Sequence, residues 1–185
     1  MRFVDGFHQP VEESYELIRS VYRASDGFVA TIDEMFPDQA AFARHLTELA
    51  ALPGAVFLLA RDDAAAGGYL FVKPRPWQRL AHTADLNMGV APGWQGRGVG
   101  HGLLLNAQER MTKEGVLEII YLMVRADNHA ARHLYEKVGF AHQALLRRDT
   151  KVGADYFDGI LMSRPVRAAA PETETGMRRA KGAPC

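Results

Sequence analysis

The chain has 185 residues, which is enough for one domain with a hydrophobic core. Lys and Arg together number 22, as do Asp and Glu, so the balanced charge provides no overall field that would favour nucleic acid or an anionic membrane. The single cysteine, Cys185, excludes an internal disulfide and a cysteine-based metal site, and we expect no bound metal.

The N-terminal residues lack the long apolar segment of a signal peptide. No apolar stretch approaches the roughly 20 residues that are needed to span a bilayer. Together with the cysteine count, these features predict a cytoplasmic protein that binds neither a membrane nor nucleic acid.

Hydrophobic spacing predicts alternating helices and strands in a mixed α/β order around one sheet. In chain order we expect helices at 13–23 and 38–52, strands at 55–60, 69–72 and 83–90, a helix at 98–114, a strand at 117–124, a helix from 127 or 128 to just before Gly139, and strands at 141–147 and 155–162. Residues 61–68 read as a turn and 73–79 as a loop. We expect one domain at 1–165 and a disordered tail at 166–185, where apolar periodicity is lost.

A glycine-rich segment, Gln95-Gly-Arg-Gly-Val-Gly100, lies between a predicted strand and a predicted helix. Glycines leave backbone N–H groups unobstructed, and a helix N-terminus adds partial positive charge, so the segment suits a pyrophosphate. The nucleotide-binding P-loop pattern is absent because His101 and Gly102 follow Gly100, and the dinucleotide pattern fails at its sixth position. Taken alone, the segment is also compatible with a simple tight turn.

Residues 90–100 resemble motif A of the GNAT superfamily of N-acetyltransferases, with Gln95, Gly98 and Gly100 at its characteristic positions. Residues 128–140 resemble motif B, and residues 119–124 match the fifth strand of that family. The resemblance covers about 83–162. It implies a single α/β (α+β) domain whose mixed, mostly antiparallel, twisted sheet has six or seven strands, is flanked by helices and splays at the fourth and fifth strands. It also implies acetyl-CoA as cosubstrate.

The resemblance assigns a set of residues to CoA: Met88, Gly89, Val90, Gln95, Gly96, Arg97, Gly98, Val99, Gly100, Asn128 and Tyr135. Asn128 and Tyr135 are seven positions apart, which is about two helical turns, so both fall on nearly the same face. The simpler interpretation is that Asn128 only caps a helix and Tyr135 is a core aromatic.

The implied reaction is direct attack of an amine on the thioester carbonyl. Tyr135 is the candidate that hydrogen-bonds the departing thiolate, and the Met88 backbone N–H is the candidate donor to the carbonyl oxygen. Asp85 shares a strand face with Asn87 and is the favoured general base, acting through water. Two histidines, His82 and His101, are the other candidates, and a surface role for Asp85 also remains open.

The acceptor expected from the resemblance is a primary amine of a small molecule or amino acid. A protein N-terminus or lysine is the alternative, and a non-catalytic acyl-CoA sensor or a nucleotide-phosphate-binding protein would be rivals of another class. The loop at 73–79 and the N-terminal helices are expected to flank the acceptor, although the loop could equally be solvated. A homodimer is considered, with nothing in the sequence to decide it.

Overall fold

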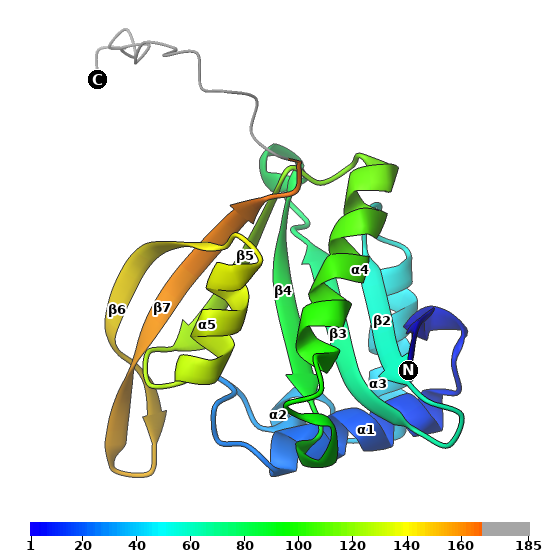
Figure 1. The fold of residues 1–185 in the computed structure, drawn as a ribbon, viewed down its shortest axis with the longest axis horizontal. Coiled ribbons are helices and arrows are strands. Elements are labelled where there is room, and N and C mark those ends of the chain that lie inside the picture. Colours follow the sequence, from blue (N-terminus) through cyan, green and yellow to red (C-terminus); the bar gives the residue numbers. More distant parts are fainter. Residues whose placement is uncertain (168–185) are drawn as a thin grey trace, which may run out of the picture.

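The computed structural model describes residues 1–167, which form one seven-stranded sheet flanked by helices (Figure 1). The strand order is β1-β2-β3-β4-β5-β7-β6. The bounds are β1 Arg2–Asp5, β2 Val56–Arg61, β3 Ala66–Pro74, β4 Thr83–Val90, β5 Ile119–Arg125, β6 Ala141–Val152 and β7 Asp155–Pro165. The expected fold class is confirmed.

Helices cover both faces of the sheet and produce two hydrophobic clusters. One face packs against α1 (Val11–Arg23), α2 (Ile32–Met35) and α3 (Gln39–Ala50), and the other against α4 (Val99–Glu114) and α5 (His129–Lys137). Short 3-10 turns lie at Gly6–His8, Gln78–Leu80 and Pro92–Trp94. Strands β2 and β3 are almost continuously buried because they have helices on both sides.

The sheet opens between its two central strands. β4 and β5 pair in parallel only over Thr83–Asp85 and Ile119–Tyr121. Beyond Asp85, β4 continues to pair with β3, while β5 continues to pair with β7. The second half of each strand therefore diverges from the other, as the sequence resemblance implied.

The predicted elements agree with the structure to within a few residues, except in three places. β1 and the single-turn helix α2 were not expected, and β6 runs five residues beyond the predicted end at residue 147. Val166, which the sequence placed in the tail, is buried and its N–H donates to the Glu118 carbonyl. The remainder of the predicted tail, 168–185, lies outside the described residues. Within 1–167, no helix combines the length and hydropathy needed to cross a membrane.

Candidate active site

A cleft of about 400 Å³ lies between the N-terminus of α4, strand β4 and helix α5; we call it the α4–α5 cleft. Its walls include most of the residues that the sequence assigned to CoA: Met88, Gly89, Val90, Gln95, Gly96, Gly98, Val99, Gly100, Asn128 and Tyr135. Arg97 is not among the residues that line it. The α4–α5 cleft has the size of a typical small-molecule site.

The glycine-rich loop forms the mouth of this cleft through an unusual backbone conformation. Gly96 and Gly98 have φ values of 72° and 76°, in the left-handed region that glycine tolerates best. Gly98 is the N-cap of α4, and within residues 1–167 no side chain caps that helix end. The first N–H groups of α4 lack carbonyl partners within the helix, so they are available to an anion in the cleft.

The backbone of β4 exposes polar groups toward the gap in the sheet. The Ala91 N–H donates to the Gly67 carbonyl and the Arg75 N–H to the Thr83 carbonyl, so the β3–β4 register makes alternate β4 residues the hydrogen-bonded ones. Met88 and Val90 fall on the other set, whose N–H and C=O groups point away from β3. The side-chain amide of Gln95 donates to the Val90 carbonyl at 3.1 Å, which agrees with this direction.

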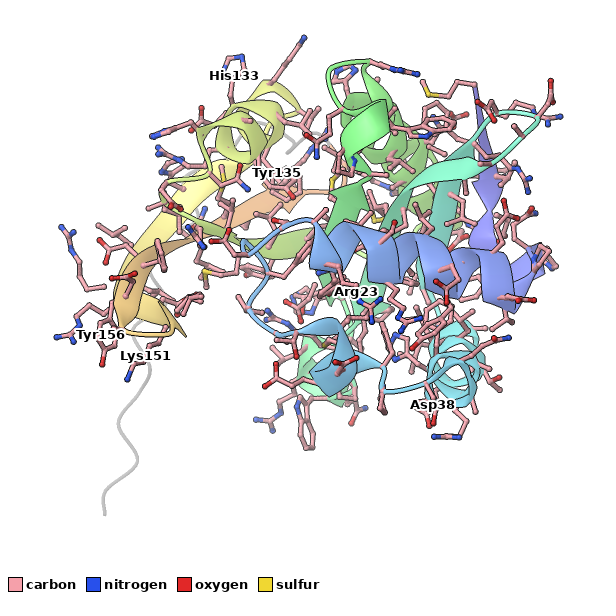
Figure 2. The ribbon with its side chains drawn as sticks, turned by 90° about the horizontal axis from the view of Figure 1, so that it is seen from below. Arg23, Asp38, His133, Tyr135, Lys151 and Tyr156 are labelled. Carbon is pink, nitrogen blue, oxygen red and sulfur yellow. The ribbon has the colours of Figure 1, made fainter. Side chains whose placement is uncertain are left out.

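Helix α5 contributes two polar side chains from one of its faces. Asn128 caps the helix, since its Oδ1 accepts from the Ala131 N–H at 3.1 Å. Tyr135, two turns later, is 9% exposed and packs edge-to-face on Phe140. Burial raises the pKa of Tyr135 to about 12, so its hydroxyl remains a proton donor at any physiological pH. Figure 2 shows Tyr135 pointing from α5 toward the centre of the molecule.

A second cleft, of about 430 Å³, lies over the gap between β4 and β5; we call it the β4–β5 cleft. It shares six lining residues with the α4–α5 cleft: Ser25, Phe28, Met88, Asn128, Ala131 and Tyr135. The two clefts therefore meet beside the Tyr135 phenol and the Met88 backbone. A ligand in either cleft would border these shared residues, which form the junction of the clefts.

Asp85 lines the β4–β5 cleft and is paired with an arginine. Its carboxylate accepts from Arg75 Nη2 at 2.6 Å and from Arg75 Nε at 3.0 Å. The ion pair raises the pKa of Arg75, whose guanidinium also lies 4.6 Å from the Tyr121 ring centroid. The Asp85 side chain is 56% exposed, so it remains accessible to water and to a ligand despite the pair.

The segment after α1 lines both clefts, and Arg125 anchors this segment. This arginine at the end of β5 donates to the Asp26 carbonyl at 3.0 Å and makes a bidentate pair with Asp127 at 2.6 and 2.9 Å. Its guanidinium lies 3.6 Å from the Phe157 ring centroid, and its side chain is 9% exposed. Arg125 thereby joins the segment after α1, the start of α5 and β7.

The two candidate histidines occupy different environments. His101 lines the α4–α5 cleft in the first turn of α4. His82 precedes β4 and lines neither cleft. The N-terminal helices were expected to flank the acceptor, but the individual residues from that region that line the clefts were not predicted, because an ordinary amphipathic helix and loop carry no signal of a site. These residues are Val21, Ala24, Ser25 and Phe28. Among residues 1–167, no group of three or more His, Cys, Asp or Glu side chains is arranged to hold a metal ion.

The sheet splays between β4 and β5, with the N-terminus of α4 on one side of the gap and a second cleft on the other. This arrangement is the one expected of an acyltransferase that uses a CoA thioester. The family model described as "Acetyltransferase (GNAT) family" matches residues 15–140. The chain belongs to this family. The expectation of an acetyltransferase is thereby confirmed.

Known proteins with similar sequences and structures agree with the family. N-alpha-acetyltransferase RimI of Mycobacterium tuberculosis is 37% identical over 130 residues, which cover 68% of this chain and 74% of that protein. The ribosomal protein bS18-alanine N-acetyltransferase of Escherichia coli is 39% identical over 90 residues, covering 47% of this chain but only 58% of the relative. A GNAT superfamily phosphinothricin acetyltransferase from Sinorhizobium meliloti, solved in complex with acetyl-CoA, superposes with a TM-score of 0.76 at 22% identity, covering 89% of this chain and 87% of that one.

Proposed function

We propose that the protein transfers an acetyl group from acetyl-CoA to the α-amino group of a protein N-terminus. The observation that carries this proposal is the 37% identity to N-alpha-acetyltransferase RimI over 68% of the chain. The relatives named for ribosomal protein bS18 alanine support the same acceptor class. The sequence had favoured a small-molecule amine, with a protein N-terminus as its alternative, and these relatives support the alternative.

The geometry supports a donor site in the α4–α5 cleft and an acceptor site in the β4–β5 cleft. Backbone N–H groups at the start of α4 would hold the pyrophosphate of acetyl-CoA, and the β4 backbone at Met88 and Val90 would hold its pantetheine arm. The thioester would then lie at the junction of the clefts, beside Tyr135. The β4–β5 cleft, which follows the gap in the sheet, would receive the extended chain terminus.

Three groups of this chain would serve the chemistry at the junction. The Met88 N–H donates to the carbonyl oxygen as negative charge develops on it. The Tyr135 hydroxyl donates to the departing sulfur. Asp85 accepts the amine proton through water, while two hydrogen bonds from Arg75 orient the carboxylate. The acetyl group passes directly from the sulfur to the amine nitrogen as the C–N bond forms and the C–S bond breaks, so no residue of the chain becomes acetylated.

Intact-mass measurement on matched peptides tests the acceptor class. Three kinds of acceptor are compared: a peptide with a free α-amine and no lysine, a matched peptide with a blocked α-amine and one lysine, and a free amino acid. Acetylation of the free α-amine peptide alone supports the proposal. Equal acetylation of the blocked lysine peptide would instead assign a lysine acceptor, and acetylation of the free amino acid alone would restore the small-molecule acceptor.

A further inference from the structure

A third cavity, of about 150 Å³, lies beneath α2 against β3 and β4; we call it the β3–β4 cavity. Its inner wall is apolar and almost fully buried, with Phe36, Leu49 and Phe71 at 4%, 1% and 7% exposure. The His45 ring contacts two of these rings: its centroid lies 5.0 Å from that of Phe36 and 6.0 Å from that of Phe71. Burial, followed by the charge of Lys73, lowers the pKa of His45, so its imidazole is neutral near pH 7.

The β3–β4 cavity adjoins the β4–β5 cleft along strand β4. Asp85, Leu86 and Asn87 line both spaces. The Asn87 amide is oriented by the Tyr69 hydroxyl, which donates to its Oδ1 at 3.0 Å. The polar end of the cavity therefore faces the place where the acceptor amine would stand, and its apolar end points away from that place.

The cavity has the size of one side chain. An apolar cavity of about 150 Å³ is known to hold a benzene molecule and to exclude water when empty. An isobutyl or phenyl group would therefore fill the β3–β4 cavity, whereas a methyl group would leave most of it unoccupied. Its walls favour an uncharged occupant, because they are mainly aromatic and aliphatic.

We propose that the β3–β4 cavity receives the side chain of the first residue of the acceptor and selects an apolar side chain of leucine to phenylalanine size. This inference rests on the proposed function, because it assumes that the amine in the β4–β5 cleft is the α-amine of a chain terminus. It specifies which termini are acetylated: those that begin with a large apolar residue are preferred over those that begin with glycine or alanine.

Four peptides that differ only in their first residue (Gly, Ala, Leu or Phe) test this selection. For the wild type we expect kcat/KM to be about 10- to 100-fold higher for the Leu and Phe peptides than for the Gly peptide. Met35→Trp places a large ring at the exposed rim of the cavity, where Met35 is 42% exposed, and should reduce that ratio at least tenfold. Met35→Phe is a smaller change at the same position, for use if Met35→Trp does not fold.

Leu105→Trp is the matched control, because Leu105 is similarly exposed (46%) but lies on α4 and lines none of the three spaces. For Leu105→Trp, the ratio of kcat/KM for the Leu and Phe peptides to kcat/KM for the Gly peptide should equal the wild-type ratio. A wild type that acetylates all four peptides with equal kcat/KM would overturn the inference, as would a preference that Met35→Trp leaves intact. A Met35→Trp effect on the use of hexanoyl-CoA relative to acetyl-CoA, with acceptor preference intact, would assign the cavity to the acyl chain and also overturn it.

A binding measurement separates failure of this inference from failure of the proposed function. Glycinamide, leucinamide and phenylalaninamide are added to the CoA-bound protein, and the unfolding temperature is recorded. If no peptide is acetylated but only leucinamide and phenylalaninamide stabilise the wild type, and neither stabilises Met35→Trp, then the cavity assignment stands without the proposed function. Equal effects of all three amides, with peptides acetylated, would leave the function in place and refute the cavity assignment.

Discussion

We expect the hydroxyl of Tyr135 to act as a hydrogen-bond donor in this site rather than as an acid that gives up its proton. A thiol has a pKa near 8.5, whereas burial raises the pKa of Tyr135 to about 12. Full proton transfer from the phenol to a departing thiolate would therefore cost roughly 5 kcal/mol. Donating a hydrogen bond to the thiolate avoids that cost and still stabilises the charge.

Replacing Tyr135 with phenylalanine should lower kcat about 10- to 100-fold, the value of one hydrogen bond to a charged group. The Kd for acetyl-CoA, measured by calorimetry, should change little, because the bond strengthens only as charge reaches the sulfur. Tyr156→Phe is the control, since Tyr156 is 46% exposed on the hairpin of β6 and β7, apart from Tyr135 (Figure 2). An unchanged kcat would remove Tyr135 from the mechanism.

Asp85 is predicted to take the proton of the amine, and its ion pair with Arg75 does not preclude this. Asp85→Asn should lower kcat/KM about 100-fold. It should also move the midpoint of the rise in kcat/KM with pH upward, toward the pKa near 8 of a free α-amine, because only amine that is already neutral would then react. The alkaline side should stay flat to about pH 10, because the pKa of Tyr135 is raised.

Asp63→Asn provides the comparison for Asp85→Asn. Asp63 also forms an ion pair, with Arg2 at 2.7 Å, but its side chain is 98% exposed and lines none of the clefts. Loss of that surface pair should leave both kcat/KM and the pH profile as they are in the wild type. A pH profile of Asp85→Asn that matches the wild type would exclude Asp85 as the base.

At the scale of elements, the junction of the glycine loop and α4 depends on one backbone conformation. A Cβ added at Gly98 would meet no atom within 4 Å, so Gly98→Ala introduces strain only through its φ of 76°. That strain is about 1–2 kcal/mol. If the loop relaxes to relieve it, the N–H groups at the start of α4 turn away from the cleft, and the Kd for CoA should rise about tenfold.

Gly153→Ala isolates the effect of strain from the effect on binding. Gly153 has a φ of 61° in the turn between β6 and β7, and a Cβ there would also meet nothing within 4 Å. Both variants should lose similar stability in chemical denaturation, but only Gly98→Ala should bind CoA more weakly. Equal CoA affinity in the two variants would contradict the role given to the loop.

The helices and strands differ in how clearly the sequence indicates them. Helix α4, whose apolar stripe lies between Gly98 and Gly115, and strand β4 were predicted closely. Helix α2 is one turn long, yet Thr31 and Glu34 form a capping box that is readable as Thr-x-x-Glu and was overlooked. Strand β6 was predicted too short because bulges interrupt its register, and its side chains are mostly exposed, so no alternation marks its course.

At the scale of the whole molecule, the site combines residues that the sequence motifs predict with residues that no sequence motif predicts. The residues from β4, α4 and α5 belong to a motif in which backbone conformation and helix capping restrict the choice of amino acid, so they were predictable. The residues from α1 and the segment after it face the site only because of how that helix packs across the sheet. The Arg75 partner of Asp85 and the β3–β4 cavity likewise follow from tertiary packing, which periodicity does not encode.

Arg125 joins the segment after α1 to the start of α5. Its removal should weaken acceptor binding more than CoA binding. Arg125→Met leaves Asp127 unpaired and frees the Asp26 carbonyl, so we expect the free energy of unfolding to fall by about 2–4 kcal/mol and the KM for a peptide acceptor to rise about tenfold.

The segment that Arg125 anchors at Asp26 carries Gly27 and Val29, which line the β4–β5 cleft alone, and Ser25 and Phe28, which line both clefts. The glycine loop that would hold CoA lies outside this segment. The Kd for CoA should therefore change less than the acceptor KM. Arg147→Met is the matched control, because Arg147 pairs with Asp158 at 2.7 Å while 77% exposed, and its loss should cost less than about 1 kcal/mol. Arg125→Lys keeps the charge without the bidentate fork and should recover only part of the stability. If Arg125→Met weakened CoA and acceptor equally while remaining folded, Arg125 would be a general stabilising residue and would not position the acceptor side of the site.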